Sequence, residues 1–316
     1  MLDKKTETLI IPDLLRELRL DQALAQILTD YSRSQIQQWI ESGNVLVNQR
    51  PCKAKMKVKG GEVVNIEVTF KSHAESLAQE IPLSILFEDE SIIIINKPVG
   101  MVVHPGAGNA DQTLFNALLH HSSQLQSLPR AGILHRLDKN TSGLLVIAKT
   151  PLAFKKLSHQ LKNRTIKREY RAIVQGLFIS GGLIDAPIGR HPIHRKRMTV
   201  IDTGKSSQTH YRIIEKYRAH TLLQVRLETG RTHQIRVHFS HIHHPIVGDP
   251  VYGGRMQLAK GMSNQLITAL REFKRQALHA CALGLYHPDT DELMQWQINL
   301  PDDMQKLIHI LRDDIQ

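Results

Sequence analysis

The sequence is poor in three features that often decide what a protein can be: cysteine, aromatic residues and long apolar runs. Its two cysteines, Cys52 and Cys281, stand far apart among 316 residues and form no CxxC pair, so we expect neither a disulfide scaffold nor a zinc ribbon. Aromatic residues make up 5% of the chain, which argues against a large aromatic-lined channel for single strands. No apolar run reaches membrane length. We therefore expect a cytosolic protein that does not enter a membrane.

The chain carries an excess of positive charge. It has 41 Lys and Arg against 30 Asp and Glu, a net charge of +11, and its 41% hydrophobic content is ample for a folded core. Residues 1–70 hold 10 basic and 9 acidic side chains, whereas residues 71–316 hold 31 and 21. A polyanion, most often a nucleic acid, is the partner that such an excess favours, and a basic enzyme that is merely soluble is the alternative.

Residues 13–70 have the pattern of a small domain with both helices and strands. Two helices are predicted, one from apolar residues at helical spacing near Leu20 and one that starts at the capping-box pattern of Ser32–Gln35 and ends at Gly43. Short strands are expected at residues 45–48 and 63–68. Between them, alternating lysines place their charges on one side of an extended segment: Lys53, Lys55, Lys57 and Lys59.

This segment resembles an S4-type RNA-binding module. The matching residues are Arg19-Leu20-Asp21, Ser32-Arg33, Gly43-Asn44-Val45, Val47-Asn48 and Gly61-Glu62. The resemblance implies that the basic side chains of the module bind RNA, namely Arg33, Lys53, Lys55 and Lys57. The alternative is a small α/β domain whose charges are only solvated.

The remainder of the chain is predicted to be a larger α+β domain. Residues 71–84 are polar and end near a proline, which indicates a linker before a domain at 85–316. The run Ile92–Ile95 indicates a buried strand. Further strands are predicted at 144–148, 170–174, 211–214, 222–227, 280–285 and 293–298, and helices at 113–121 and 152–161. Strands outnumber helices without regular alternation, so we expect a mainly antiparallel mixed sheet.

Four loop motifs combine turn-forming residues with charged side chains, the composition of positioned functional loops. They are Asn96-Lys97-Pro98-Val99-Gly100 with His104-Pro105-Gly106, His135–Gly143, Arg168-Glu169-Tyr170, and Gly230–Arg236. The second contains Asp138, with Arg136 and Lys139 as neighbours. A carboxylate near guanidinium groups stays ionised, which suits a nucleophile or general base and not a general acid. By itself, Asp138 would more simply be a turn residue.

Together the motifs resemble those of the RluA-type pseudouridine synthases. His135-Arg136-Leu137-Asp138 followed by Thr141-Ser142-Gly143 is similar to the signature loop of that family, and the other loops, with His244-Pro245, Gly248-Asp249 and Tyr252-Gly253, follow in the family's order. The resemblance runs from about residue 84 to the C-terminus. It is nearest to the D-type group that modifies large-subunit rRNA, through residues 102–109 and 248–254.

The resemblance implies roles for individual residues. Asp138 matches the catalytic aspartate, Tyr170 the tyrosine that stacks on the target base, and Arg236 the basic residue that pairs with the aspartate. Arg136 resembles the arginine that enters the RNA stack and helps to expel the target nucleotide. Arg231 is predicted to bind RNA. Without the resemblance, Tyr170 would be an ordinary strand tyrosine, and Arg231 and Arg236 would contact phosphates or solvent.

Two other patterns are set aside. His238, His241, His243 and His244 lack a nearby Cys or Glu at a familiar ligand spacing, and Gly106-Ala107-Gly108 is only half of a dinucleotide fingerprint. We expect neither a metal nor a cofactor.

The resemblance thus implies an isomerase that makes pseudouridine in large-subunit (23S) rRNA, at the loop of helix 69, by a catalytic aspartate and base flipping. The expected partners are large-subunit rRNA or the assembling large ribosomal subunit, and we expect a monomer. The dense basic segments 149–171 and 190–212 agree with an RNA substrate but do not select a uridine. Two alternatives stay open: modification of tRNA or another rRNA site, and an RNA chaperone or ribosome assembly factor.

Overall fold

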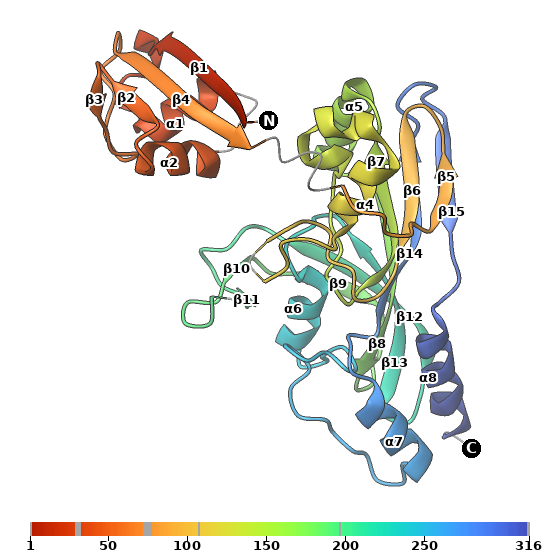
Figure 1. The fold of residues 1–316 in the computed structure, drawn as a ribbon. Coiled ribbons are helices and arrows are strands. Elements are labelled where there is room, and N and C mark those ends of the chain that lie inside the picture. Colours follow the sequence, from red (N-terminus) through yellow and green to blue (C-terminus); the bar gives the residue numbers. More distant parts are fainter. Residues whose placement is uncertain (1, 29–32, 72–77, 107, 196, 315–316) are drawn as a thin grey trace. The chain divides into compact units, whose positions relative to one another are not determined.

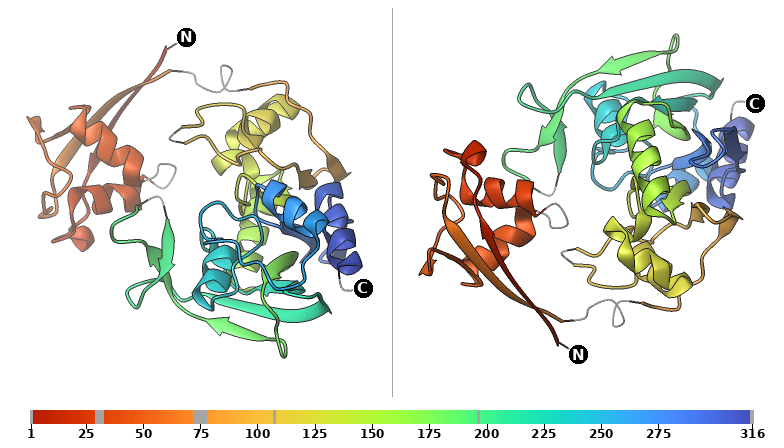
Figure 2. Two further views of the ribbon diagram at one scale, coloured as in Figure 1. Left: turned by 90° about the horizontal axis from the view of Figure 1, so that it is seen from below. Right: turned by 90° about the horizontal axis from the view of Figure 1, so that it is seen from above.

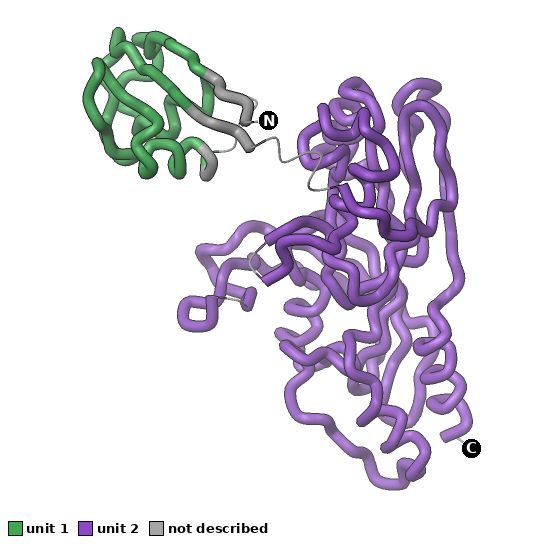
Figure 3. Tube along the Cα trace, in the orientation of Figure 1, with its two compact units in different colours: residues 1–77 green, residues 78–316 purple. Residues whose placement is uncertain are grey.

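The structure, a computed structural model, describes residues 2–28, 33–71, 78–106, 108–195 and 197–314. The chain divides into two compact units, residues 1–77 and 78–316 (Figure 3). Residues 72–77 of the predicted linker and Ser32, the predicted helix cap, lie outside the described residues. The domain boundaries 13–70, 71–84 and 85–316 stay a prediction.

The first unit packs two helices against an antiparallel sheet (Figure 1). Gly43, at φ 79°, follows the second helix, and its N–H donates to the carbonyl of Ile40, as expected of a glycine that ends a helix. The core joins both helices to the sheet through Leu20, Leu24, Ile36, Val45 and Val64. The helices are α1 (Leu20–Ile27) and α2 (Arg33–Glu41), with η1 (Asp13–Leu15) before them, and the sheet order is β1 (Leu2–Ile10), β4 (Val63–Lys71), β2 (Val45–Val47), β3 (Arg50–Pro51).

Strand β1 was not predicted. It pairs with β4 over nine residues, from Leu2 opposite Lys71 to Ile10 opposite Val63. It lies at the edge of the sheet, and its sequence, LDKKTETLI, is charged in the way that edge strands commonly are. Such a composition hides the alternation by which a half-buried strand is recognised.

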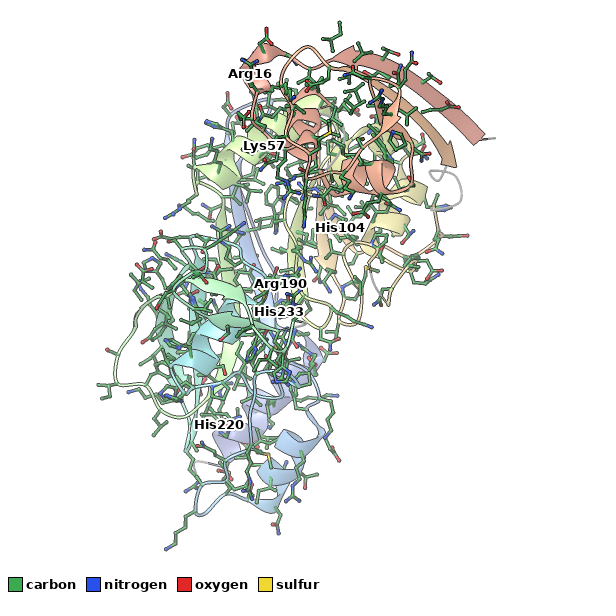
Figure 4. All side chains as sticks on the ribbon, turned by 90° about the vertical axis from the view of Figure 1, so that its left-hand side faces the viewer. Arg16, Lys57, His104, Arg190, His220 and His233 are labelled. Atoms are coloured by element: carbon green, nitrogen blue, oxygen red, sulfur yellow. The ribbon has the colours of Figure 1, made fainter. Side chains whose placement is uncertain are left out.

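The predicted lysine face forms on an irregular loop, not on a regular strand. Lys53, Lys55, Lys57 and Lys59 are exposed, whereas the residues between them face inward. Cys52, Ala54 and Met56 pack against the core, and Val58 is fully buried within it. Lys57, labelled in Figure 4, also pairs with the exposed Glu17 at 3.0 Å. The lysines therefore form a surface on one side of this loop, hereafter the lysine face.

Arg33 has an internal partner in the same unit. Its Nε and Nη2 lie 2.8 and 2.7 Å from Oδ2 of Asp21, whose side chain is fully buried. Arg19 Nε donates to Oδ1 of the same carboxylate at 3.0 Å, and the Gln37 amide donates to Oδ2. Burial alone would raise the pKa of Asp21, but these hydrogen bonds and the charge of Arg33 lower it below its usual value. Arg33 therefore joins α1 to α2, and its contact with RNA stays a prediction.

Replacing Asp21 with Asn should destabilise the first unit by about 3 kcal/mol, because two guanidinium groups lose a buried counter-charge. The sign with pH follows from the lowered pKa of Asp21: its contribution is present above the ordinary aspartate range and is lost as pH falls through the folded value. Calorimetry of the full chain between pH 3 and 7 checks both points. The wild-type transition of this unit should move downward in acid more steeply than that of Asp21→Asn, and parallel shifts would contradict the assignment.

The second unit is built on a nine-stranded sheet. Within the described residues its neighbouring strands run antiparallel, except β7 and β14, which run parallel (Figure 1). The α+β prediction with a mainly antiparallel mixed sheet is confirmed. The order is β5 (Ile85–Glu88), β6 (Ile92–Lys97), β7 (Ser142–Ala148), β14 (Leu278–Tyr286), β8 (Lys167–Gln175), β13 (His220–Leu227), β12 (Gln208–Lys216) and β9 (Gly182–Asp185), with β15 (Leu293–Gln297) on β14.

The core follows the predicted apolar runs. Ile92–Ile95 and Leu145–Ala148 are fully buried in neighbouring strands. Thr113 and Thr150 cap the two predicted helices by accepting from the backbone N–H three residues on. The helices and short turns are α4 (Leu114–His121), η2 (Ser123–Ser127), η3 (Pro129–Gly132), α5 (Pro151–Lys162), α6 (Gln234–His241), α7 (Asn264–Glu272) and α8 (Asp302–Asp313). A hairpin of β10 (Ile188–Arg190) and β11 (Met198–Val200) projects from the main sheet (Figure 2).

Candidate active site

Asp138 lies in the loop that leads into β7 at the centre of the sheet. The N–H of Thr141 donates to the carbonyl of Asp138 at 3.0 Å and forms a turn. Gly143, at φ 117°, follows where β7 meets β14, and a Cβ there would lie 2.2 Å from the Ala280 carbonyl oxygen. Only glycine allows this approach, so the loop is held at a fixed point beside the sheet.

A buried lysine, Lys97, binds the backbone of the same loop. Lys97, at the end of β6, is fully buried, and its Nζ donates to the carbonyls of Pro98, Met101 and Lys139 at 2.7, 3.0 and 3.1 Å. Burial lowers the pKa of Lys97 to about 7, although the charge of Asp138 opposes this shift. The Asn-Lys-Pro motif thus ties its own turn to the backbone next to Asp138.

Arg236 joins Asp138 to a second, buried carboxylate. From α6, its Nη1 donates to Oδ2 of Asp138 at 2.9 Å. Its Nε and Nη2 form a two-pronged pair with Asp249 at 2.6 and 2.9 Å, and the Asp249 side chain is fully buried. Burial would raise the pKa of Asp249, but the Arg236 guanidinium and the N–H groups of Val251 and Tyr252 lower it. Asp249 therefore holds the guanidinium in place.

Tyr170 stands on β8, between β14 and β13, with 5% of its surface exposed. Burial raises the pKa of its phenol, and the negative charge of Asp138 raises it further, against the opposing charge of Arg168. The phenol therefore stays neutral, so Tyr170 offers a flat ring beside the carboxylate and no ionised oxygen.

Asp138, Tyr170 and Arg236 line one cleft of about 730 Å³ in the second unit. Arg136 and Arg231 are exposed along it, and their contact with RNA stays a prediction. Among its lining residues the only carboxylates are Asp138 and Glu228, against seven arginines and lysines: Arg130, Arg136, Lys162, Arg164, Arg168, Arg231 and Arg236. The cleft thus attracts a polyanion and is large enough for a nucleoside. The lysine face and Arg33 belong to the other unit.

Three residues beside Asp138 were not identified as functional from the sequence: Lys97, Asp249 and His233. Each is in a motif that the sequence displays, but the partner that gives it a role lies far along the chain. Asp249 accepts from Arg236, 13 residues earlier, and Lys97 donates to Lys139, 42 residues later. For Lys97 and Asp249 the available signal was a charged residue directly before a proline, in Asn96-Lys97-Pro98 and Gly248-Asp249-Pro250. For His233 the only signal was its place in the Gly230–Arg236 motif.

The histidines set aside as metal ligands have separate partners. His238 is buried and contacts the Thr209 hydroxyl and the Ala186 carbonyl, whereas His244 contacts the Gln175 carbonyl and stacks against Phe178. Within the described residues, no three His, Cys, Asp or Glu side chains are grouped so that they could hold a metal ion. Over the same ranges, no helix is both long and apolar enough to cross a membrane.

Comparison with known families and proteins identifies both domains. Residues 91–241 match the family model described as RNA pseudouridylate synthase, and residues 18–64 match the S4 domain. The chain is 54% identical over 299 residues to the ribosomal large subunit pseudouridine synthase D of Escherichia coli K12, covering 94% of this chain and 92% of that protein. It is 47% identical to the synthase of the same name from Xanthomonas campestris, over 99% of this chain and 95% of that protein.

Solved structures show the same fold. The human RNA pseudouridylate synthase domain containing 4 matches with a TM-score of 0.56 and 26% identity, over 76% of this chain and 95% of that chain. By its catalytic and S4 domains, and by identity over nearly its whole length to D-type synthases, the chain belongs to the RluA-type family of pseudouridine synthases, which are isomerases.

Proposed function

We propose that this enzyme isomerises uridine to pseudouridine in large-subunit (23S) rRNA, and that its targets are uridines in the loop of helix 69. The relatives named as ribosomal large subunit pseudouridine synthases support the substrate class. The observation that carries the proposal is the carboxylate of Asp138, held by Arg236 inside a cleft lined mainly by basic side chains. Helix 69 as the target rests on the D-type resemblance of residues 102–109 and 248–254.

Asp138 is proposed as the nucleophile. Its carboxylate attacks either the uracil ring or ribose C1′, and the bond between N1 and C1′ breaks. The base then rotates and C5 bonds to C1′, and the bond between the Asp138 oxygen and the attacked carbon breaks, which releases the carboxylate. The proton on C5 leaves and N1 gains a proton, so that product and substrate are isomers. Arg236 stabilises the ionised carboxylate within the closed site, and the neutral ring of Tyr170 stacks on a pyrimidine while it turns.

Base flipping gives the exposed arginines their proposed roles. A uridine in folded RNA reaches Asp138 only after it leaves the stack, and a planar guanidinium from Arg136 can fill the vacated space. Arg231 would bind phosphate beside the cleft. Lys53, Lys55 and Lys57 on the lysine face, and Arg33, would hold the RNA through contacts that do not depend on its sequence. The proposed substrate is either free rRNA or an assembling large subunit, bound by a monomer.

Two other functions remain as outcomes of a test. Purified enzyme should be incubated separately with 23S rRNA, large ribosomal subunits and total tRNA, and pseudouridines mapped by carbodiimide primer extension. We expect new stops at helix 69 loop uridines and none in tRNA. Stops confined to tRNA would replace the rRNA assignment with the tRNA alternative. Tight rRNA binding without any pseudouridine would favour the chaperone or assembly factor.

A further inference from the structure

His233 has an unusual backbone conformation next to Asp138. It lies at φ 57° and ψ 20°, in the left-handed region, at the residue that precedes α6. For a residue with a Cβ this conformation costs on the order of 1–2 kcal/mol and persists only where its surroundings impose it. Figure 4 labels His233 in the middle of the larger unit.

Tyr252 holds the His233 ring at its Nδ1 atom. The Tyr252 hydroxyl lies 2.8 Å from Nδ1, and the two rings meet edge to face at 5.6 Å. The same hydroxyl oxygen accepts the N–H of Met198 at 2.9 Å. A hydroxyl has a single proton to donate, and Nδ1 of His233 is the acceptor within reach. The neutral imidazole then carries its own proton on Nε2.

The Nε2 atom of the His233 ring faces Asp138, the proposed nucleophile. Nε2 lies 3.9 Å from Oδ1 of Asp138, while Oδ2 accepts from Arg236 at 2.9 Å. The two carboxylate oxygens therefore differ, because one is bound by the guanidinium and the other faces an N–H across a gap. A movement of about 1 Å closes that gap to a hydrogen bond, the kind of tightening that follows substrate binding.

We propose that His233 is a positioning residue for the isomerisation: its Nε2–H orients Oδ1 of Asp138 as the attacking oxygen. The Tyr252 hydroxyl acts through His233, because it fixes the tautomer that places the proton on Nε2. The inference rests on the proposed function, since it takes Asp138 as the nucleophile.

The charge state of His233 gives the proposal a pH signature. Burial lowers the pKa of His233, and among the charged groups that face it Asp138 and Asp249 raise it while Arg236 and Arg136 lower it. The ring is thus neutral near pH 7. Once protonated, it forms an ion pair with Oδ1, so that both oxygens of Asp138 are held by cations. The wild-type rate should therefore fall as acid protonates His233.

The test is a set of single-turnover rates on helix 69 RNA. His233→Gly keeps the left-handed backbone without a ring, and Tyr252→Phe keeps the ring that lies 5.0 Å from the Arg236 guanidinium carbon. We expect the rate to fall about 10- to 100-fold for His233→Gly and less for Tyr252→Phe, with RNA affinity unchanged. The double variant should be no slower than His233→Gly, since the hydroxyl has lost the group through which it acts. His241→Ala, at the exposed end of α6, is the matched control.

Three results would overturn the inference: a His233→Gly rate within threefold of wild type, a double variant whose defect is the product of the two single defects, or an acid limb that lies at the same pH in His233→Gly as in wild type. Thermal unfolding checks the fold, and His233→Asn, which also tolerates a left-handed backbone, replaces the glycine variant if that one unfolds. Asp138→Asn, measured in the same series, distinguishes failure of the proposed function from failure of this inference. An active Asp138→Asn defeats the proposed function, whereas an inactive one beside a fully active His233→Gly defeats only this inference.

Discussion

Asp138→Asn should lose pseudouridine formation almost completely, with a rate at least about 10⁴-fold below wild type. An amide has nearly the shape of the carboxylate but neither its charge nor its nucleophilic oxygen. RNA affinity should be retained, because the arginines and lysines that line the cleft are unchanged. Single-turnover rates and filter binding with one RNA measure both quantities.

The Asp138→Asn variant should keep its fold, so a loss of activity can be attributed to the carboxylate. Arg236 keeps its two-pronged pair with Asp249, so the free energy of unfolding should change by less than about 1 kcal/mol. Asp202→Asn makes the same chemical change at an exposed position of the same unit, away from the residues that line the cleft. It should be as active as wild type. Equal activity of the two variants would remove Asp138 from the mechanism.

Arg236→Met should produce the second large effect, on activity and stability together. It leaves Asp249 fully buried without its guanidinium, which costs about 3–5 kcal/mol of unfolding free energy. It also removes the cation from Asp138, so the rate should fall about 10²- to 10³-fold. Calorimetry and single-turnover kinetics report the two losses separately.

The double variant Arg236→Met with Asp249→Asn separates the loss of stability from the loss of activity. Removing both buried charges should recover much of the stability lost in Arg236→Met, because no uncompensated charge is left in the interior. Activity should stay low, since Asp138 still lacks its partner. Stability that does not recover would mean that packing, and not the ion pair, sets the cost. Activity that recovers with stability would mean that Arg236 acts only through the fold.

The parts of the fold that could be predicted are those that a short local sequence pattern determines. Four consecutive isoleucines predict a buried strand, and residues 92–95 are fully buried in β6. Thr150-Pro151 predicts a helix start, and Thr150 caps α5. Strand β1 and helix α6 both lack a clear apolar pattern, for different reasons. Strand β1 is charged along an edge, and α6 holds polar side chains that are buried against distant partners, such as Gln234 and His238.

The candidate site could be predicted only as far as resemblance reached. The motifs singled out Asp138, Tyr170 and Arg236, and the structure brings these side chains to one cleft. Periodicity does not show that Arg236 also binds Asp249, or that Lys97 supports Lys139, because these contacts depend on how separate loops meet across the sheet. Arg33 shows another contact that the sequence does not reveal: the S4 resemblance implies RNA binding, which stays a prediction, and the structure pairs Arg33 with the buried Asp21.

The central claim is that the Asp138 carboxylate makes pseudouridine in the helix 69 loop. Its most direct test is pseudouridine mapping of 23S rRNA from cells that lack this protein, complemented with wild type, Asp138→Asn or Asp202→Asn at equal expression. Wild type and Asp202→Asn should restore the modified loop, and Asp138→Asn should leave it unmodified. Restoration by Asp138→Asn, or an unmodified loop in every strain, would contradict the claim.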